Sequence, residues 1–203
     1  MLLSTFIDIF YYEQYFLVDF YVILGLMSKI ILITGGQRSG KSAYAEQLAL
    51  SLSDHPVYMA TAHIWDEEFK ERVRQHQARR GPCWTNIEEE RCLSRHDVHD
   101  RVVLVDCLTL WCTNFFHQAG GEDTLPDVNH VLEEVTAEFD RLTSQAATFI
   151  FVTNEIGSGG VSGNALQRRF TDLLGWLNQY VAAHADTVVF MVSGIPVTIK
   201  GQS

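Results

Sequence analysis

The sequence predicts an α/β fold in which helices flank a mainly parallel central sheet and an antiparallel strand lies at its C-terminal edge. Two observations support this prediction. Short apolar, β-branched runs alternate with longer amphipathic stretches along the chain, which is typical of parallel strands joined by crossover helices. The last apolar run, residues 197–199, instead follows the one before it after only a turn, so we expect that pair to be antiparallel.

The first predicted strand, residues 29–34, leads into Gly-Gly-Gln-Arg-Ser-Gly-Lys-Ser at residues 35–42, and a helix is expected over residues 43–52. Strand, loop and helix in this order are the context in which Gly, four residues, Gly, Lys and Ser mark a P-loop. Gly35 and Gly40 permit backbone torsions that a Cβ atom forbids, so successive N–H groups can surround phosphate oxygens at the helix start. The alternative is a glycine-rich turn that matches the pattern by chance.

The lysine and the serine that end this motif have defined tasks in a P-loop. Lys41 is expected to reach the β- and γ-phosphates of a nucleoside triphosphate, and the Ser42 hydroxyl to sit on a magnesium ion. We therefore predict a P-loop NTPase-like domain.

Length, composition and charge fit a single domain of this kind. The chain has 203 residues, of which 47% are apolar. A net charge of −10 argues against a nucleic-acid binder, but not against nucleotide binding, because a P-loop supplies its own local positive field. The four cysteines form no CxxC pair and no zinc-site spacing, which indicates reduced thiols and a cytoplasmic protein.

Residues 1–26 stand apart from the predicted domain, residues 27–203. They are rich in Phe, Tyr, Leu and Ile and contain no lysine or arginine, so the basic region of a signal peptide is missing. Their charge-free runs are shorter than the roughly 20 apolar residues that span a bilayer, so no stable membrane span is expected. Because Met27 leads straight into the first strand, we interpret residues 1–26 as a start-site artefact, or as an extension that is disordered or packed on a partner. A membrane-surface role is the alternative.

The remaining elements follow in order along the chain. Strands are predicted over residues 56–60, 101–106, 148–153 and 187–192, and helices over residues 66–79, 108–117, 127–142 and 164–183. We expect a loop or short strand at residues 84–88, a glycine-rich loop at residues 156–163, and a turn at residues 193–196 before the edge strand.

Polar residues and one glycine stand where several of the predicted strands end, and ligands of open parallel sheets bind at that edge. These residues are Thr34, Gly35, Thr61, Asp106, Asn154 and Glu155. Asp106 is either a Walker-B carboxylate that holds magnesium or the N-cap of the helix that follows. Glu155 either orients a substrate hydroxyl or caps a loop.

The histidines form no pattern of their own. His76 shares one face of the helix over residues 66–79 with Phe69 and Val73, and a lone histidine of this kind is usually structural or exposed. His96 and His99 lie in a charged segment, which is more typical of a solvated loop than of a metal site.

Several short segments, taken together and in order, indicate a protein family. They are Ile-Thr-Gly-Gly-Gln-Arg-Ser-Gly-Lys-Ser at 33–42, Tyr-Met-Ala-Thr-Ala at 58–62, Arg-Val-Arg-Gln-His at 72–76, Val-Asp-Cys-Leu-Thr at 105–109, Val-Thr-Asn-Glu-Ile-Gly at 152–157, Arg-Arg-Phe at 168–170 and Val-Ser-Gly-Ile-Pro at 192–196, with Trp111, Asn114 and Asn178. This set resembles the bifunctional adenosylcobinamide kinase/adenosylcobinamide-phosphate guanylyltransferase family of cobalamin biosynthesis. The resemblance extends from about residue 28 to residue 201.

The resemblance implies two reactions. In the first, the γ-phosphate of ATP or GTP is transferred to the aminopropanol hydroxyl of adenosylcobinamide. In the second, GMP from GTP is transferred to that phosphate through a guanylylated histidine, giving adenosylcobinamide-GDP and pyrophosphate. His76 holds the place of that histidine, three residues after the pair Arg72-Val73. The resemblance also implies a homotrimer.

The site residues that the resemblance implies fall into three groups. His76 and Lys41 are the catalytic residues, and Ser42 and Asp106 hold Mg²⁺. The implied nucleotide contacts are Gly35, Gly36, Gln37, Arg38, Ser39, Gly40, Lys41, Ser42, Thr61, Ala62, His63, Gln77, Ala78, Arg79, Arg80, Glu88 and Asp106.

The two chemistries are compatible with these residue types. Phosphoryl transfer needs charge neutralisation and alignment, which Lys41, Mg²⁺ and the loop amides would supply. A neutral imidazole can take up a nucleotidyl group and pass it on. Since the two reactions have different leaving groups, we expect the helix that bears His76 to move relative to the P-loop.

Some residues depart from the family pattern, and two other functions stay open. Gln75 stands where some relatives have a second histidine, Arg80-Gly81-Pro82 replaces a common Arg-Pro, and residues 1–26 have no family counterpart. The alternatives are a P-loop small-molecule kinase with an inert His76 and a non-catalytic GTP-binding protein. Neither the preferred phosphate donor nor the corrinoid-binding residues follow from the sequence.

Overall fold

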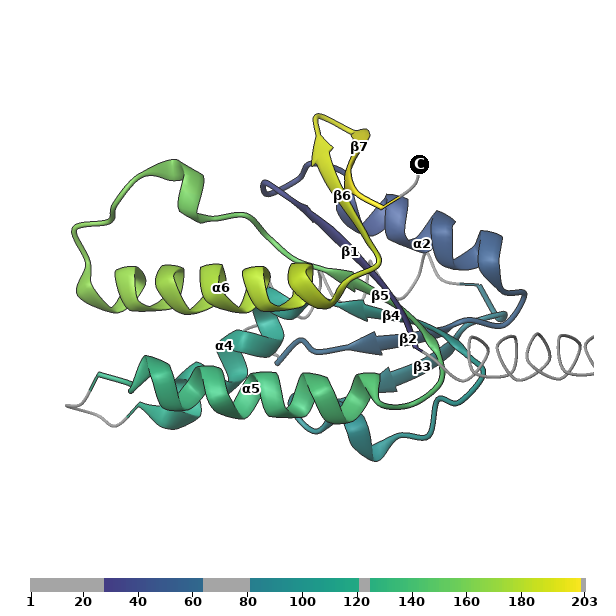
Figure 1. Cartoon of the computed structure of the whole chain (residues 1–203), viewed down its shortest axis with the longest axis horizontal. Helices are drawn as coiled ribbons and strands as arrows, with labels where there is room; N and C mark the ends of the chain where they lie inside the picture. The colour runs from purple at the N-terminus through teal and green to yellow at the C-terminus, as the bar shows by residue number, and fades with distance from the viewer. Residues whose placement is uncertain (1–27, 64–80, 121–124, 202–203) are drawn as a thin grey trace, which may run out of the picture.

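The computed structural model describes residues 28–63, 81–120 and 125–201. In these ranges the chain forms a seven-stranded sheet of order β3-β2-β4-β5-β1-β6-β7, with helices on both faces (Figure 1). Every neighbouring pair of strands is parallel except β6 and β7, which are antiparallel. The predicted fold class, including the antiparallel C-terminal edge, is confirmed.

The elements lie close to their predicted bounds. In chain order they are β1 (Lys29–Gly35), α2 (Lys41–Leu52), β2 (Val57–Ala60), β3 (Thr85–Glu88), the 3-10 helix η1 (Leu93–Arg95), β4 (Val102–Asp106), α4 (Leu108–Ala119), α5 (Val128–Thr143), β5 (Thr148–Val152), the 3-10 helix η2 (Gly157–Gly159), α6 (Ala165–His184), β6 (Thr187–Val192) and β7 (Ile195–Lys200). The segment predicted as a loop or short strand is β3. The predicted helix over residues 66–79 and the segment 1–26 lie outside the described residues.

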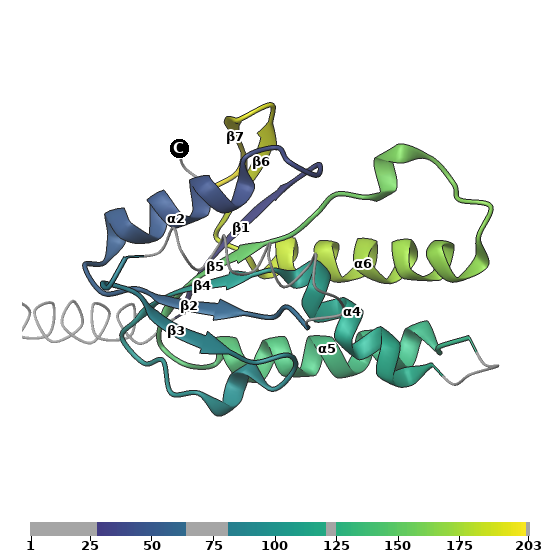
Figure 2. The same ribbon diagram turned by 180° about the vertical axis from the view of Figure 1, so that it is seen from behind.

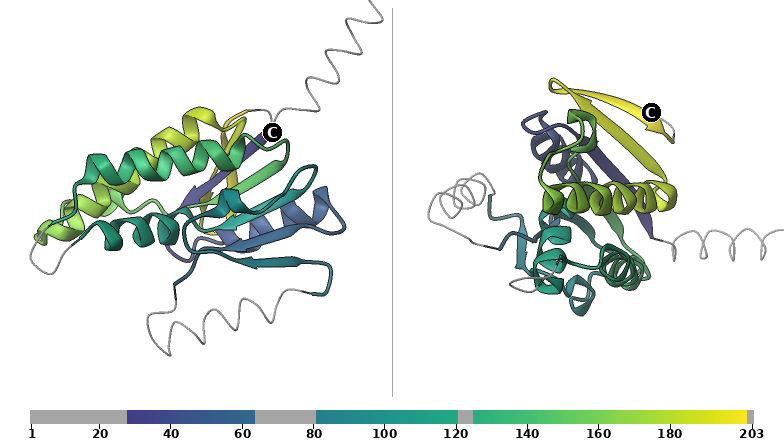
Figure 3. Two further views of the ribbon diagram at one scale, coloured as in Figure 1. Left: turned by 90° about the horizontal axis from the view of Figure 1, so that it is seen from below. Right: turned by 90° about the vertical axis from the view of Figure 1, so that its left-hand side faces the viewer.

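The sheet separates two apolar layers, and the alternation of side chains along β1 shows how. Ile30 and Leu32 pack with α4, α5 and α6, whereas Ile31 and Ile33 pack with Ala45 and Ala49 of α2. Figures 1 and 2 show α2 on one side of the strands and the other three helices on the opposite side. Helices α5 and α6 lie side by side in that second layer (Figure 3).

The long helices begin at residues that cap them. The Asp127 side chain accepts hydrogen bonds from the backbone N–H groups of residues 129 and 130 at the start of α5. The Asn164 side chain accepts from those of residues 166 and 167 at the start of α6. These bonds satisfy helix N–H groups that have no intrahelical partner, and they explain why both helices start where the sequence predicts.

The turn before the last strand is shorter than predicted. Ser193 and Gly194 have φ angles of 51° and 86°, which is the backbone of a two-residue hairpin, and Val192 pairs directly with Ile195. The prediction that Ile195 and Pro196 belong to the turn is therefore wrong. Pro196 is tolerated in β7 because an edge strand can do without one N–H donor.

Within the described ranges, no helix has the length and apolar character needed to cross a membrane.

Candidate active site

The P-loop lies at the edge of the sheet where the parallel strands end. It follows β1, which is flanked by β5 and β6, so the loop is surrounded by the ends of both strands. Asp106 is the last residue of β4 and is aligned with Val152 of β5. The predicted convergence of strand ends on one edge is confirmed for β1, β2, β4 and β5.

Two glycines of the loop are required by their surroundings. Gly35 has a φ angle of +150°, and a Cβ atom there would lie 2.6 Å from the backbone oxygen of Met191 in β6. Gly40 caps α2 with a φ angle of +95°, and its Cβ would lie 3.3 Å from Cα of Gly194. The loop therefore has this shape only if both positions lack a side chain.

Hydrogen bonds hold the loop between two neighbouring segments. The N–H of Gly194, in the β6–β7 turn, donates to the Ser39 oxygen at 3.0 Å. The N–H of Glu155, just after β5, donates to the Gly35 oxygen at 3.0 Å. Both contacts come from distant parts of the sequence, and they fix the start and the middle of the loop.

Lys41 is the buried cation of the site. Its side chain is 7% exposed, and Nζ donates a hydrogen bond of 2.6 Å to the Gly36 oxygen. Burial lowers the pKa of Lys41, while Cys107 and Asp106 act in the opposite direction. Burial also raises the pKa of the Cys107 thiol to about 12, so this thiol is neutral at pH 7, and the charge that favours the ammonium is that of Asp106.

The Asp106 carboxylate is held by a neighbouring strand rather than by the following helix. Its Oδ2 accepts a hydrogen bond of 2.6 Å from the Tyr58 hydroxyl of β2. Helix α4 has Cys107 at its N-cap without a side-chain cap bond, so the interpretation of Asp106 as a helix cap is wrong. Asp106 is close enough to Lys41 to favour the charged form of the lysine, and its role as a Walker-B carboxylate stays a prediction.

Ser42 and Asp106 offer oxygen donors of the kind that Mg²⁺ prefers. Ser42 is half-buried in the first turn of α2, and Asp106 has a carboxylate at the neighbouring strand end. No cluster of three or more His, Cys, Asp or Glu residues that could hold a metal occurs in the parts of the chain that the structure describes. Beside a nucleotide Mg²⁺ usually takes only one or two protein ligands, and Ser42 and Asp106 are donors of that kind.

The predicted nucleotide contacts after β2 lie at the same edge. Thr61 is fully buried, and its hydroxyl donates to the Cys107 oxygen at 2.8 Å and accepts from the Cys107 N–H at 2.9 Å. Ala62 follows it, and Nδ1 of His63 lies 2.7 Å from the Glu90 carboxylate. Glu88 ends β3 and is exposed. His76 and residues 77–80 lie outside the described residues.

Hydrogen bonds among four polar residues shape the end of β5, and the sequence predicts none of these bonds. Thr153 donates from its hydroxyl to Asn178 Oδ1 at 2.7 Å, and Asn178 Nδ2 donates to the Asn154 oxygen at 3.1 Å. The Asn154 N–H donates to the Thr109 hydroxyl at 2.9 Å. All four residues belong to the segments that carry the family resemblance, and that resemblance is the sequence signal that could have pointed to them.

The other candidate side chains have local partners. Oε1 of Glu155 accepts a bond of 2.8 Å from the Gly157 N–H, so Glu155 caps its own loop, as the second alternative stated. Nδ1 of His99 lies 2.8 Å from Asp97, and both side chains are exposed, which confirms the solvated loop for His99. His96 is half-buried, with Nε2 3.8 Å from the Glu89 carboxylate, so the prediction is wrong for this residue.

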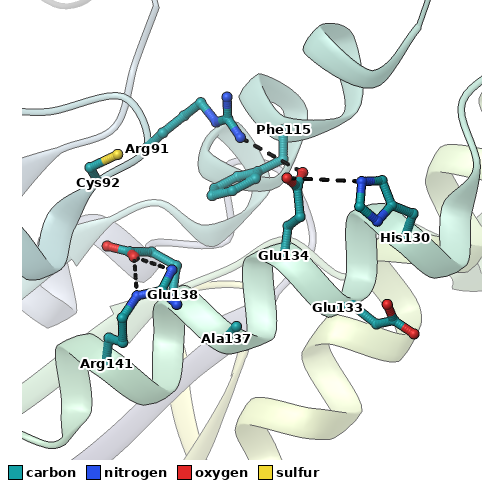
Figure 4. A pocket seen from close by; sticks show the side chains of 9 residues that line it. All are labelled: Arg91, Cys92, Phe115, His130, Glu133, Glu134, Ala137, Glu138 and Arg141. Carbon is teal, nitrogen blue, oxygen red and sulfur yellow. Dashed lines mark hydrogen bonds and ion pairs between the residues drawn. The ribbon is translucent and has the colours of Figure 1, made fainter.

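A hollow of about 440 Å³ lies apart from the P-loop, between α4, α5 and the segment after β3 (Figure 4). Arg141 donates to Glu138 from Nε and Nη2 at 2.9 and 2.7 Å, and Arg91 covers the Phe115 ring at 4.3 Å. Arg91 also lies 3.8 Å from Glu134. These mutual pairs make the hollow part of the helix packing.

Comparison with known proteins decides the family. The family model for cobinamide kinase / cobinamide phosphate guanyltransferase matches residues 31–199. The chain belongs to this family. It is therefore a bifunctional cobinamide kinase and cobinamide phosphate guanylyltransferase of adenosylcobalamin biosynthesis, as the sequence resemblance implied.

Two relatives of this cobinamide kinase/guanylyltransferase family match along nearly their whole length. The bifunctional adenosylcobalamin biosynthesis protein CobP of Pseudomonas aeruginosa is 38% identical, over 84% of this chain and 97% of that protein. The bifunctional adenosylcobalamin biosynthesis protein CobU of Escherichia coli is 36% identical, over 84% and 99%. Among solved structures, the flagellar accessory protein FlaH from Methanocaldococcus jannaschii matches with a TM-score of 0.44 and 14% identity, covering 86% of this chain and 79% of that one. A likeness this remote says nothing about activity.

Proposed function

We propose that both reactions take place at the P-loop edge of the sheet, with Lys41 serving the triphosphate and His76 carrying GMP. The observation that supports this most directly is the buried Lys41 ammonium, which lies beside Asp106 at the start of a helix whose N–H groups face the same edge. A cation and a row of amides together favour the polyphosphate of a nucleotide.

In the kinase step, residues 35–42 would hold the triphosphate through their amides. Lys41 would exchange its bond to the Gly36 oxygen for the β- and γ-phosphate oxygens, which carry more negative charge. Ser42 and Asp106 would hold Mg²⁺, which supplies further charge neutralisation when it is bound. The substrate hydroxyl oxygen bonds to the γ-phosphorus, the bridge to the β-phosphate breaks, and the hydroxyl proton is released.

In the guanylyltransferase step, the neutral imidazole of His76 would attack the α-phosphorus of GTP and release pyrophosphate. A phosphate oxygen of adenosylcobinamide phosphate then bonds to the same phosphorus, and the bond to His76 breaks. The histidine returns to its starting form, so one displacement is divided into two. An unperturbed histidine pKa near 6.5 leaves a usable neutral fraction at pH 7.

The proposed nucleotide contacts are residues 35–42, 61–63, 77–80, Glu88 and Asp106. We also propose that the enzyme works as a homotrimer in the cytoplasm. The family resemblance is the basis of the proposed trimer, and the four free cysteines are the basis of the proposed location. Size-exclusion chromatography with light scattering tests the trimer.

One labelling experiment tests the role of His76. The protein is incubated with GTP labelled at the α-phosphate, denatured, and examined for label that is stable in base and lost in acid. We expect such label in the wild type and in the control His99→Ala, whose histidine is exposed, but none in His76→Ala. Label that persists in His76→Ala would refute the proposed nucleophile. Absence of label together with phosphorylation of cobinamide would indicate a plain kinase, and binding without turnover a non-catalytic GTP-binding protein.

A further inference from the structure

A groove of about 630 Å³ lies between α6 and the glycine-rich loop that precedes it. We call it the α6 groove. Gly157 and Val161 line it from the loop, and Arg168, Gly175 and Trp176 line it from the helix. Figure 1 shows the loop leaving the end of β5, passing outward, and turning back into α6. The volume is within the range of about 300–1,000 Å³ that is usual for small-molecule sites.

The inner end of the α6 groove adjoins the P-loop. The Glu155 N–H is bonded to the Gly35 oxygen at 3.0 Å, and the Glu155 side chain is bonded to the Gly157 N–H at 2.8 Å. Gly157 itself lines the groove. Because two residues span at most about 7 Å and the bond from Glu155 to the Gly35 oxygen is 3.0 Å, the wall of the groove begins within about 10 Å of the phosphate-binding loop.

The α6 groove exposes apolar surface that the fold does not use. Val161 is 90% exposed and Trp176 is 44% exposed, although the opposite side of α6 buries Leu173, Leu174 and Leu177 completely. An indole ring at the surface offers a large flat area for contact with a ligand. Such a ring beside a nucleotide site favours a substrate with an apolar body.

Gly175 gives a second and independent indication. It lies in the interior of α6, where glycine costs roughly 1 kcal/mol relative to alanine. A Cβ atom at this position would meet no atom within 4 Å, so packing against the protein does not require glycine here. The residue therefore keeps the floor of the groove free for something other than the chain itself.

Polar groups border this apolar floor. Arg168 donates from Nη1 to the oxygens of Ser162 and Gly163, both at 2.8 Å, which ties the loop to the helix. Its guanidinium has five N–H donors in total, so it can serve the loop and a ligand together. Asp172 also lines the groove and supplies acceptors. Donors and acceptors around an apolar floor suit a ligand that has an apolar body and carboxamide groups at its periphery.

We propose that the α6 groove holds the corrin macrocycle of adenosylcobinamide while its hydroxyl-bearing side chain extends to the P-loop. The inference rests on the proposed function and names the substrate site that belongs to it. A corrin ring carries methyl groups and carboxamide side chains around a broad, largely apolar body, which matches Trp176, Gly175 and the bordering polar groups. The macrocycle is larger than the groove, so one edge lies inside it and the remainder faces solvent.

The first test of this inference places a larger side chain in the α6 groove. Gly175→Met places a side chain in the open space, and Ala183→Met places the same side chain on an exposed part of α6 outside the groove. We expect Gly175→Met to raise KM for adenosylcobinamide at least tenfold and to leave guanylylation of the enzyme by labelled GTP within twofold of the wild type. Ala183→Met should change neither quantity. Unchanged KM in Gly175→Met would overturn the inference.

A second readout does not need turnover. Cobinamide without nucleotide should quench tryptophan fluorescence in the wild type, and the quenched component should be absent from Trp176→Phe and reduced in Gly175→Met. Quenching that is equal in wild type and Trp176→Phe would contradict the groove even if the kinase is active. Trp176-dependent quenching without phosphorylation would support the groove and contradict the proposed function. If Gly175→Met unfolds, Trp176→Ala decides through the same KM and guanylylation measurements.

Discussion

Replacement of Gly35 by alanine should disrupt the phosphate-binding loop, and the structure allows the size of the effect to be estimated. The new Cβ would lie 2.6 Å from the Met191 oxygen, a distance below the 3.0 Å that real Cβ atoms respect, and the obstacle is backbone rather than a flexible side chain. Overpacking of this kind costs about 1–3 kcal/mol. The φ angle of +150° adds strain of about 1–3 kcal/mol for a residue with a Cβ.

These two contributions lower the free energy of unfolding by at least about 2 kcal/mol. For a chain of this size that corresponds to a melting temperature lowered by at least about 4–8 °C. The assay is thermal and urea denaturation of the nucleotide-free protein. Gly36→Ala is the matched control, because a Cβ atom at Gly36 would meet nothing within 4 Å.

The two variants should differ clearly. If Gly35→Ala and Gly36→Ala melted within 1 °C of each other by this assay, the close approach of β6 to the loop would be wrong. Loss of nucleotide affinity alone does not distinguish them, because both residues lie in the proposed phosphate site.

Three further predictions concern other side chains of the described fold. Tyr58→Phe removes the hydrogen bond to the Asp106 carboxylate and should lower the free energy of unfolding in urea by about 1.5–3 kcal/mol; an unchanged midpoint would refute this. The kinase kcat/KM should fall as pH rises, because Lys41 loses its proton. Burial lowers the pKa of Lys41, so this loss occurs below the usual value of 10.5. Lys41→Arg should move that limb of the pH profile to higher pH, and a limb that does not move would exclude Lys41 as its origin. At pH 8 a thiol reagent should modify half-buried Cys83 well before Cys107, whose pKa of about 12 lowers the thiolate fraction about a thousandfold; mass spectrometry of the labelled peptides measures the order.

The order of the elements was predictable because each has a local signal. A short run of residues predicts β1 and the P-loop. The capping residues Asp127 and Asn164 mark the starts of α5 and α6. The turn before β7 was predicted too long, because proline is common in turns. The positive φ angles of Ser193 and Gly194, which set the two-residue hairpin, are not visible in composition.

The contacts that build the site were less accessible from the sequence. Tyr58 and Asp106 are 48 residues apart, and no local pattern shows that one holds the other. For this reason the sequence alone does not decide between a Walker-B carboxylate and a helix cap at Asp106. The bond between Asn178 and Asn154 depends in the same way on how α6 returns to the sheet. Tertiary contacts of this kind follow from the assembled fold rather than from residue type.

The position of β1 has a consequence for when the site can form during protein synthesis. Its flanking strands, β5 and β6, and the Gly194 N–H that holds the loop all come from the last third of the chain. A nascent polypeptide therefore carries the whole phosphate-binding sequence long before the ribosome has made the segments that support it. We expect nucleotide capture to begin only after release from translation, and stop codons placed just before β6 to yield fragments that keep the motif and bind nothing.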